Sequence, residues 1–226
     1  MSLDLTIRLM EIMMGLAFAQ QSLEYLASHP RLRLLFSIRL LLCICLIFGI
    51  YAHYACLGLF SIGLGMLHLF NGPYNGGSDR MGLLILSVIT ITHFAPEPIW
   101  REVAIGYLAL QLTLSYFISG WVKIVNPAWR SGQALHDVFK YSAYPVSQTL
   151  RGWAQHPKLL KNMSWAVILF ELAFPFCLIS QPSLIVGLIL AGSFHLANAC
   201  LFGLNRFFWI WLTAYPAILW FQDRIL

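Results

Sequence analysis

The sequence is poor in charge. Only 10% of its 226 residues are Asp, Glu, Lys or Arg, whereas a soluble domain carries about 25%. Apolar residues make up 59% of the chain instead. A soluble core of this size cannot hide so much apolar surface. The composition therefore excludes an ordinary soluble protein and predicts an integral membrane protein.

The chain also lacks clustered cysteines. Five cysteines occur, none of them in a Cys-x-x-Cys pair, and all of them lie in apolar runs. Such residues usually behave as small buried hydrophobes. We therefore predict neither a metal site nor a disulfide framework.

The sequence also shows no basic domain. The net charge is +5, but the basic residues stand in short loops between apolar runs, where the positive-inside rule places them. This distribution excludes nucleic acid as a partner and leaves membrane lipids. The start, MSLDLTIRLMEIMMGLAF, has no basic n-region. We expect no removable signal peptide, so that the first helix belongs to the mature chain.

Long apolar runs are abundant, and they predict about eight transmembrane helices. The fold class that follows is all-α: a polytopic helical bundle forming one membrane domain over 1–226, without a soluble domain. The first helix is rather polar and either spans inside the bundle or lies partly in the interface. The predicted helices are 8–27, 34–51, 53–70, 81–95, 102–124, 163–180, 183–202 and 206–222.

The connection 125–162, between predicted helices 5 and 6, is too polar to span. Two of its stretches nevertheless place apolar residues on one helical face. We predict one or two helices that lie on the membrane surface or re-enter it. The apolar positions are Ala134, Leu135, Val138 and Phe139 in the first stretch, and Val146, Leu150 and Trp153 in the second.

Lys123 stands near the end of an apolar run, in YFISGWVKIVNPAW. A cation at the centre of the bilayer costs roughly 2.5–3.5 kcal/mol on insertion scales. Ser119 and Tyr116 lie on the same helical stripe as Lys123, and the small pair Ser119 and Gly120 lets a second helix approach. Lys123 either faces the bundle interior or reaches the headgroups from a helix end.

Two further runs hold polar residues that need partners in hydrocarbon. In SFHLANACLF, His195 and Asn198 share a helical face. They either form hydrogen bonds between helices or belong to a site where His195 titrates or orients a ligand. His195 could also ligate haem or chlorophyll, but the sequence has no second histidine at a spacing that supports this. In WAVILFELAFPF, Glu171 is either protonated or paired, with Lys123 or His195 as its partner.

NGPYNGGSDR, residues 71–80, is the strongest turn signal in the chain. Its glycines and asparagines suit an ordinary loop. The charge pair Asp79 and Arg80 also suits a loop that folds over a membrane-embedded site. Both interpretations stay open on the sequence alone.

Three stretches together resemble a known family. YFISGWVKIVNPAWRSG resembles the YFIAG-x-x-K…W…G stretch of the membrane domain of vitamin-K-dependent gamma-carboxylase. FHLANACLFGLNRF is similar to that family's FH-x-x-N-x-x-LF stretch, and YNGGSDRMGLL to its Asn-rich turn before a span. The wider family is the bacterial horizontally transferred transmembrane (HTTM) domain. The resemblance covers most of residues 5–222.

The resemblance implies a chemistry. In the carboxylase, the matching lysine deprotonates vitamin K hydroquinone, and oxygen then turns the hydroquinone into a stronger base. It implies Lys123 and His195 as catalytic residues of a quinone or hydroquinone site. The residues expected to line the cofactor are Asn198, Tyr116, Ser119 and Glu171. Those expected on the substrate side are Asn75, Gly76, Gly77, Asp79 and Trp129.

Two functions stay open. One is an enzyme that uses a reduced quinone at Lys123, with a separate protein partner for substrate recognition. The other is a non-catalytic subunit of a larger, bioenergetic membrane complex that contributes packing and lipid, quinone or pigment contacts. The carboxylase has a large additional domain, which favours the second. It also has a histidine after its paired asparagines, where Gly76 and Gly77 occupy the turn here. The costly Lys123 favours the first. We expect the bacterial inner membrane as the location. A DoxX-type quinone protein is a weaker third fit, because this chain has too many predicted spans.

Overall fold

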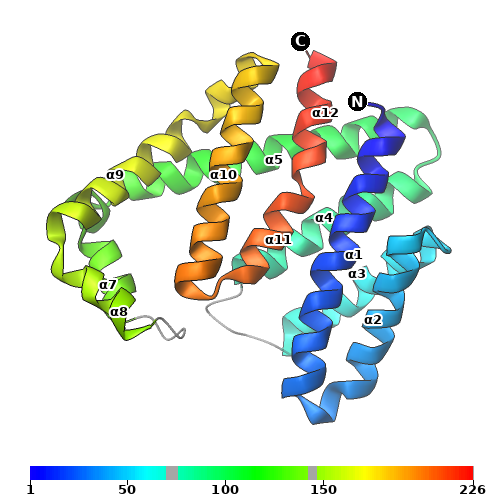
Figure 1. The fold of residues 1–226 in the computed structure, drawn as a ribbon. Coiled ribbons are helices and arrows are strands. Elements are labelled where there is room, and N and C mark those ends of the chain that lie inside the picture. Colours follow the sequence, from blue (N-terminus) through cyan, green and yellow to red (C-terminus); the bar gives the residue numbers. More distant parts are fainter. Residues whose placement is uncertain (70–75, 142–146, 226) are drawn as a thin grey trace. The chain divides into compact units, whose positions relative to one another are not determined.

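The computed structural model describes residues 1–69, 76–141 and 147–225, and every regular element in these ranges is a helix (Figure 1). The elements are α1 (Leu3–Ser28), η1 (Pro30–Leu32), α2 (Arg33–Phe48), α3 (Ala52–Leu69), α4 (Gly76–Phe94), α5 (Pro98–Val125), α6 (Pro127–Ser131), α7 (Gln133–Tyr141), α8 (Gln148–Arg151), η2 (Gly152–Gln155), α9 (Pro157–Ala173), η3 (Phe174–Ile179), α10 (Gln181–Phe202), α11 (Asn205–Thr213) and α12 (Tyr215–Ile225).

Three of these segments are long and apolar enough to cross a membrane: Pro98–Val125, Pro157–Ile179 and Gln181–Phe202. These three are the spans of this kind among the described residues. They make the chain an all-helical membrane protein, as its composition predicts. The expected total of about eight spans stays a prediction.

The chain divides into two compact units. Unit 1 comprises Met1–Ala109 and Arg206–Ile225, and unit 2 comprises Leu110–Asn205. The long helix α5 gives its first part to unit 1 and its second part to unit 2. Each unit has its own buried core and is described separately below.

In unit 1, α1 packs against α2 and also contacts α4 and α12 (Figure 1). Met10 and Met14 of α1 and Phe36 of α2 are fully buried in its core. The polar side chains of α1 face other helices too. Glu11 is 4% exposed. It accepts one hydrogen bond from Arg8 and pairs with His93, in both cases at 2.7 Å. The polar side chains of the first helix therefore make contacts inside unit 1.

The predicted eighth helix, 206–222, is two helices in the structure. α11 ends at Thr213 and α12 begins at Tyr215. Pro216 explains the break, because proline has no N–H to donate and its ring clashes with the carbonyl four residues earlier. A single straight span over 206–222 is therefore corrected to two shorter helices.

In unit 2, the connection between α5 and α9 is a series of short helices, as the apolar faces predict. Leu135 and Phe139 of α7 are buried against Leu160 and Phe202. Leu150 and Trp153 pack on the same cluster, whereas Val146 lies outside the described residues. The connection thus forms a core of its own with the start of α9 and the end of α10.

The helix that carries Glu171 tightens at Pro175. α9 ends at Ala173 and continues as the 3-10 helix η3. Pro175 cannot donate to the carbonyl of Glu171, four residues earlier, so the α-helical hydrogen bond is lost there. A 3-10 turn is the usual way in which a helix end takes up such a loss.

Candidate acid–base site

Lys123 points into unit 2 and forms an ion pair with Glu171. Its Nζ lies 2.6 Å from Oε2 and 2.8 Å from Oε1 of Glu171, and 2.6 Å from Oγ of Ser119. The lysine side chain is 13% exposed and the glutamate side chain 3%. The structure therefore favours the interior placement of Lys123 over one that reaches out to the headgroups. Of the two partners considered for Glu171, it places Lys123 in contact.

The contact depends on a close approach of two helices. A Cβ atom on Gly120 of α5 would lie 2.8 Å from the backbone nitrogen of Leu172 and 2.9 Å from Cβ of Glu171. Atoms at such distances overlap, so only glycine fits without a shift. The small pair Ser119 and Gly120 thus has two effects: Gly120 brings α9 close, and Ser119 donates a hydrogen bond to Oε1 of Glu171 at 3.2 Å.

The short helix α6 covers the ion pair from one side. The Trp129 ring centre lies 5.2 Å from Nζ of Lys123, which is a cation–π distance. The carbonyl of Trp129 accepts a hydrogen bond from Oγ of Ser164 on α9 at 2.5 Å. This bond fixes α6 to α9 and so keeps the indole beside the lysine.

A second polar contact joins α5 to α10. Oη of Tyr116 and Nε2 of His195 are 2.9 Å apart, and both residues are buried. Aromatic rings surround the pair: the Phe174 ring lies 4.2 Å from that of Tyr116, and the Phe194 ring 5.3 Å from that of His195. Phe170 contacts Tyr116 and Phe174 edge to face. An imidazole and a phenol thus meet within an aromatic wall.

Lys123 and His195 belong to separate contacts on the same helix. Tyr116 precedes Lys123 by seven residues, which is about 10 Å along a helix that rises 1.5 Å per residue. The two predicted catalytic residues both lie in unit 2 and are connected through α5. In the described residues no hydrogen bond links them directly.

The geometry sets a condition for base chemistry at Lys123. An ammonium donates hydrogen bonds and has no lone pair, so it cannot accept a proton. The arrangement with Glu171 and Ser119 suits the ammonium form. Lys123 can act as a base only after its proton moves to Glu171 or leaves the site, which makes Glu171 part of any such reaction.

The other predicted site residues are distributed as follows. Asn198 is half-buried on α10, and its side chain has no hydrogen bond to a described residue. Gly76, Gly77 and Asp79 lie in the first turn of α4, which belongs to unit 1. Asn75 lies outside the described residues.

The sequence reasoning missed a second buried cation. Arg39 of α2 is 3% exposed, and its Nη2 donates to Oε1 of Gln21 at 2.6 Å. The signal was present, because Arg39 interrupts the apolar run LLFSIRLLLCICLIF. The contact of Glu11 with His93 was also missed, since nothing local in the sequence pairs residues so far apart. No cluster of three or more metal-binding side chains occurs among the described residues.

One comparison with known proteins finds a match. The family model of the HTTM domain matches residues 92–222, which is more than half of the chain and includes Lys123, Glu171 and His195. No curated protein and no solved structure matches the chain. The match agrees with the resemblance noted in the sequence, and the chain belongs to the HTTM family of membrane proteins.

Proposed function

We propose that this membrane protein uses Lys123 as a base toward a reduced quinone bound in unit 2. The observation that carries the proposal is the buried ion pair of Lys123 with Glu171, 2.6 Å apart. Ionisable residues inside a membrane bundle are costly, and they usually mark a proton or substrate path. The membership in a carboxylase-like family makes a hydroquinone the first candidate for the proton donor.

The residues fit a hydroquinone in kind. The rings of Phe170 and Phe194 are half-buried at the edge of an aromatic cluster with Tyr116 and Phe174. A flat ring packs well against surface of this kind. When bound, the hydroquinone supplies an acidic hydroxyl and a two-electron reductant. Lys123 accepts the hydroxyl proton, and Glu171 takes the proton that Lys123 carries beforehand. Trp129 and Ser119 hold the lysine in place, and His195 with Tyr116 orients the ring.

The test is oxygen uptake by the purified protein with a reduced menaquinone. We expect uptake above the autoxidation rate in the native chain, and none above it in Lys123→Met. Lys158→Met is the matched control, since Lys158 is an exposed lysine at the start of α9. Rates are compared per folded molecule, because the substitution leaves Glu171 without its partner. An oxygen-uptake rate in Lys123→Met equal to that of the native chain would show that Lys123 is not the base.

A second function is favoured by the completeness of the same pair. Both carboxylate oxygens of Glu171 accept hydrogen bonds from Nζ of Lys123, so neither residue needs a ligand as its partner. Such a pair also serves to fix helix packing in a non-catalytic subunit of a larger membrane complex. In this case the protein contributes packing and lipid, quinone or pigment contacts.

Extraction from native membranes in a mild detergent, followed by mass spectrometry of what co-elutes, separates the two functions. A large complex in fixed ratio supports the subunit. Elution alone or with one small protein partner and a bound quinone supports the enzyme. The membrane fraction from which the protein is extracted also tests our proposal that it resides in a bacterial inner membrane. That the whole chain is one membrane domain stays a prediction.

A further inference from the structure

Arg39 is a buried cation whose hydrogen bonds are incomplete. Its Nη2 donates to Gln21, and the guanidinium carbon lies 4.2 Å from the centre of the Phe18 ring. Its Nε and Nη1 are buried and have no hydrogen-bond partner among the described residues. Leaving donors of a buried charge unpaired is costly, so a fold that keeps them indicates a partner of another kind.

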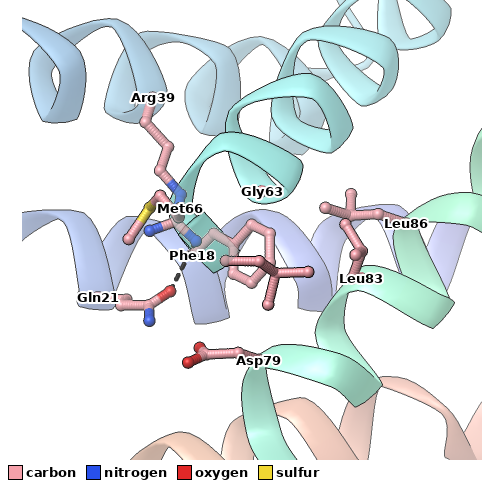
Figure 2. A pocket seen from close by; sticks show the side chains of 9 residues that line it. Phe18, Gln21, Arg39, Gly63, Met66, Asp79, Leu83 and Leu86 are labelled. Atoms are coloured by element: carbon pink, nitrogen blue, oxygen red, sulfur yellow. Dashed lines mark hydrogen bonds between the residues drawn. The ribbon is translucent and has the colours of Figure 1, made fainter. Parts of the chain in front are cut away.

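The nearest carboxylate in the same cluster is Asp79, and it does not pair with Arg39. Asp79 is half-buried in the first turn of α4, and among the described residues neither side chain takes part in an ion pair with the other. The Gln21 side chain accepts a hydrogen bond from Arg39 and lines the same cavity as Asp79. Figure 2 shows the amide of Gln21 next to the guanidinium of Arg39, which lies against the Phe18 ring.

A small cavity separates these groups. Its volume is about 30 Å³, and Arg39, Gln21 and Asp79 line its polar side. This is room for one or two groups of the size of a water molecule. The remaining wall is apolar and includes Met66, Leu67 and Leu83. Leu67 is 38% exposed, so the apolar wall reaches the outer surface of α3.

The charges around the cavity limit what fits. A carboxylate head would pair with Arg39 but would lie beside the carboxyl group of Asp79, and an ammonium would lie beside Arg39. Arg206 faces Asp79 from a second small pocket next to this one. The small volume also excludes a phosphate. A hydroxyl fits both neighbours, because it accepts a hydrogen bond from a guanidinium and donates one to a carboxylate.

We propose that unit 1 holds a binding site for an apolar molecule with a hydroxyl head group, such as a long-chain alcohol. The hydroxyl lies between Arg39 and Asp79, and the apolar body follows the wall of Met66 and Leu67 to the surface of α3. The site lies outside residues 92–222, which match the family model, and it is independent of the chemistry proposed for Lys123.

Two glycines of α3 provide a matched test. A Cβ on Gly63, which lines the cavity, would lie 3.1 Å from Cδ1 of Leu83, whereas a Cβ on Gly65 would have nothing within 4 Å. Gly63→Ala therefore adds a methyl group to the cavity wall, and Gly65→Ala adds the same group in open space. A second pair is Arg39→Met with Arg33→Met, since Arg33 is exposed on the same helix.

The measurement is equilibrium binding of radiolabelled 1-decanol to the full-length protein in phosphatidylcholine nanodiscs, with decanoate and decylamine as competitors. Partition into lipid is equal for all variants and cancels. We expect saturable binding of one decanol in the native protein and in the two control variants, and its loss in Gly63→Ala and Arg39→Met. Asp79→Asn removes the repulsive charge and should let decanoate compete.

Three results would overturn the proposal. Stronger competition by decanoate than by unlabelled decanol in the native protein would make the site an anion site. Equal binding by Gly63→Ala and Gly65→Ala would place the alcohol elsewhere. No saturable binding at all would mean that the cavity holds water only.

Discussion

Each unit of the molecule contains a buried cation, and the two are treated differently. In unit 2, Lys123 contacts both oxygens of Glu171, a serine and an indole. In unit 1, Arg39 has one hydrogen bond to a neutral amide and no direct carboxylate partner among the described residues. One charge is complete within the chain, and the other is open to an additional partner. The difference indicates that burial of a charge alone does not tell whether the chain itself supplies all the partners of that charge.

The largest effect on stability is expected from removing one residue of the Lys123–Glu171 ion pair. Lys123→Met leaves the Glu171 carboxylate buried without its cation, and breaking a buried pair in this way costs about 3–5 kcal/mol of unfolding free energy. Replacing both residues, as Lys123→Met with Glu171→Leu, should recover most of that loss. Reversible unfolding in mixed micelles measures both variants.

The double-mutant cycle measures how strongly Lys123 and Glu171 stabilise each other. A coupling energy near zero, in which the double variant loses the sum of the two single losses, would contradict the contact geometry of Lys123 and Glu171. A strong coupling would agree with it. The same cycle on Arg39 and Asp79 should give a smaller value, because they do not touch directly.

The second effect concerns the helix approach that closes the pair. Gly120→Ala puts a methyl group 2.8 Å from the backbone nitrogen of Leu172 and forces α5 away from α9. Overpacking of this kind costs about 1–3 kcal/mol. On the same helix, Gly106→Ala meets only Phe221 at 3.6 Å, an ordinary contact. We expect the control to gain about 0.5–1 kcal/mol from helix propensity, and a thermal melt of both variants to show opposite shifts.

The site of Lys123 and Glu171 (the closed site) was easier to predict from the sequence than the site of Arg39, Gln21 and Asp79 (the open site). Helical spacing placed Ser119, Tyr116 and Lys123 on one stripe, and the cost of a charge in hydrocarbon required a partner such as Glu171. Trp129 came from the family resemblance alone. The break of the last predicted helix could have been read from Pro216, because a proline interior to a helix interrupts it.

The open site was missed for a physical reason. Arg39, Gln21 and Asp79 lie on three different helices, and no periodicity relates positions on separate helices to one another. A charge inside an apolar run signals that a partner exists without naming it. For Lys123, a conspicuous carboxylate in another run, Glu171, supplied the partner. For Arg39 the only hydrogen-bonded neighbour among the described residues is an amide, and an amide gives no comparable signal.

A third test asks whether unit 2 is stabilised at its uncharged contact as well. Tyr116→Phe keeps the ring against Phe174 and removes the hydroxyl that meets His195 at 2.9 Å. Loss of one partner from a buried hydrogen bond costs about 1–3 kcal/mol, and we expect the lower half of that range because the aromatic wall is retained. Tyr107→Phe on the same helix is the control, since Tyr107 is 54% exposed. Equal melting temperatures for the two variants would contradict a stabilising contact between Tyr116 and His195.

The smallest effect is expected at Arg39, and it sharpens the comparison most. Arg39→Met removes one hydrogen bond and the contact with the Phe18 ring, but it also removes the cost of burying an incompletely paired charge. These contributions oppose each other, so we expect the unfolding free energy to change by less than about 1 kcal/mol. A loss as large as that of Lys123→Met would mean that Arg39 is as completely paired as Lys123, and the contrast between the two units would fail. A change close to zero, together with loss of decanol binding, would mean that Arg39 contributes little to the fold and serves a ligand.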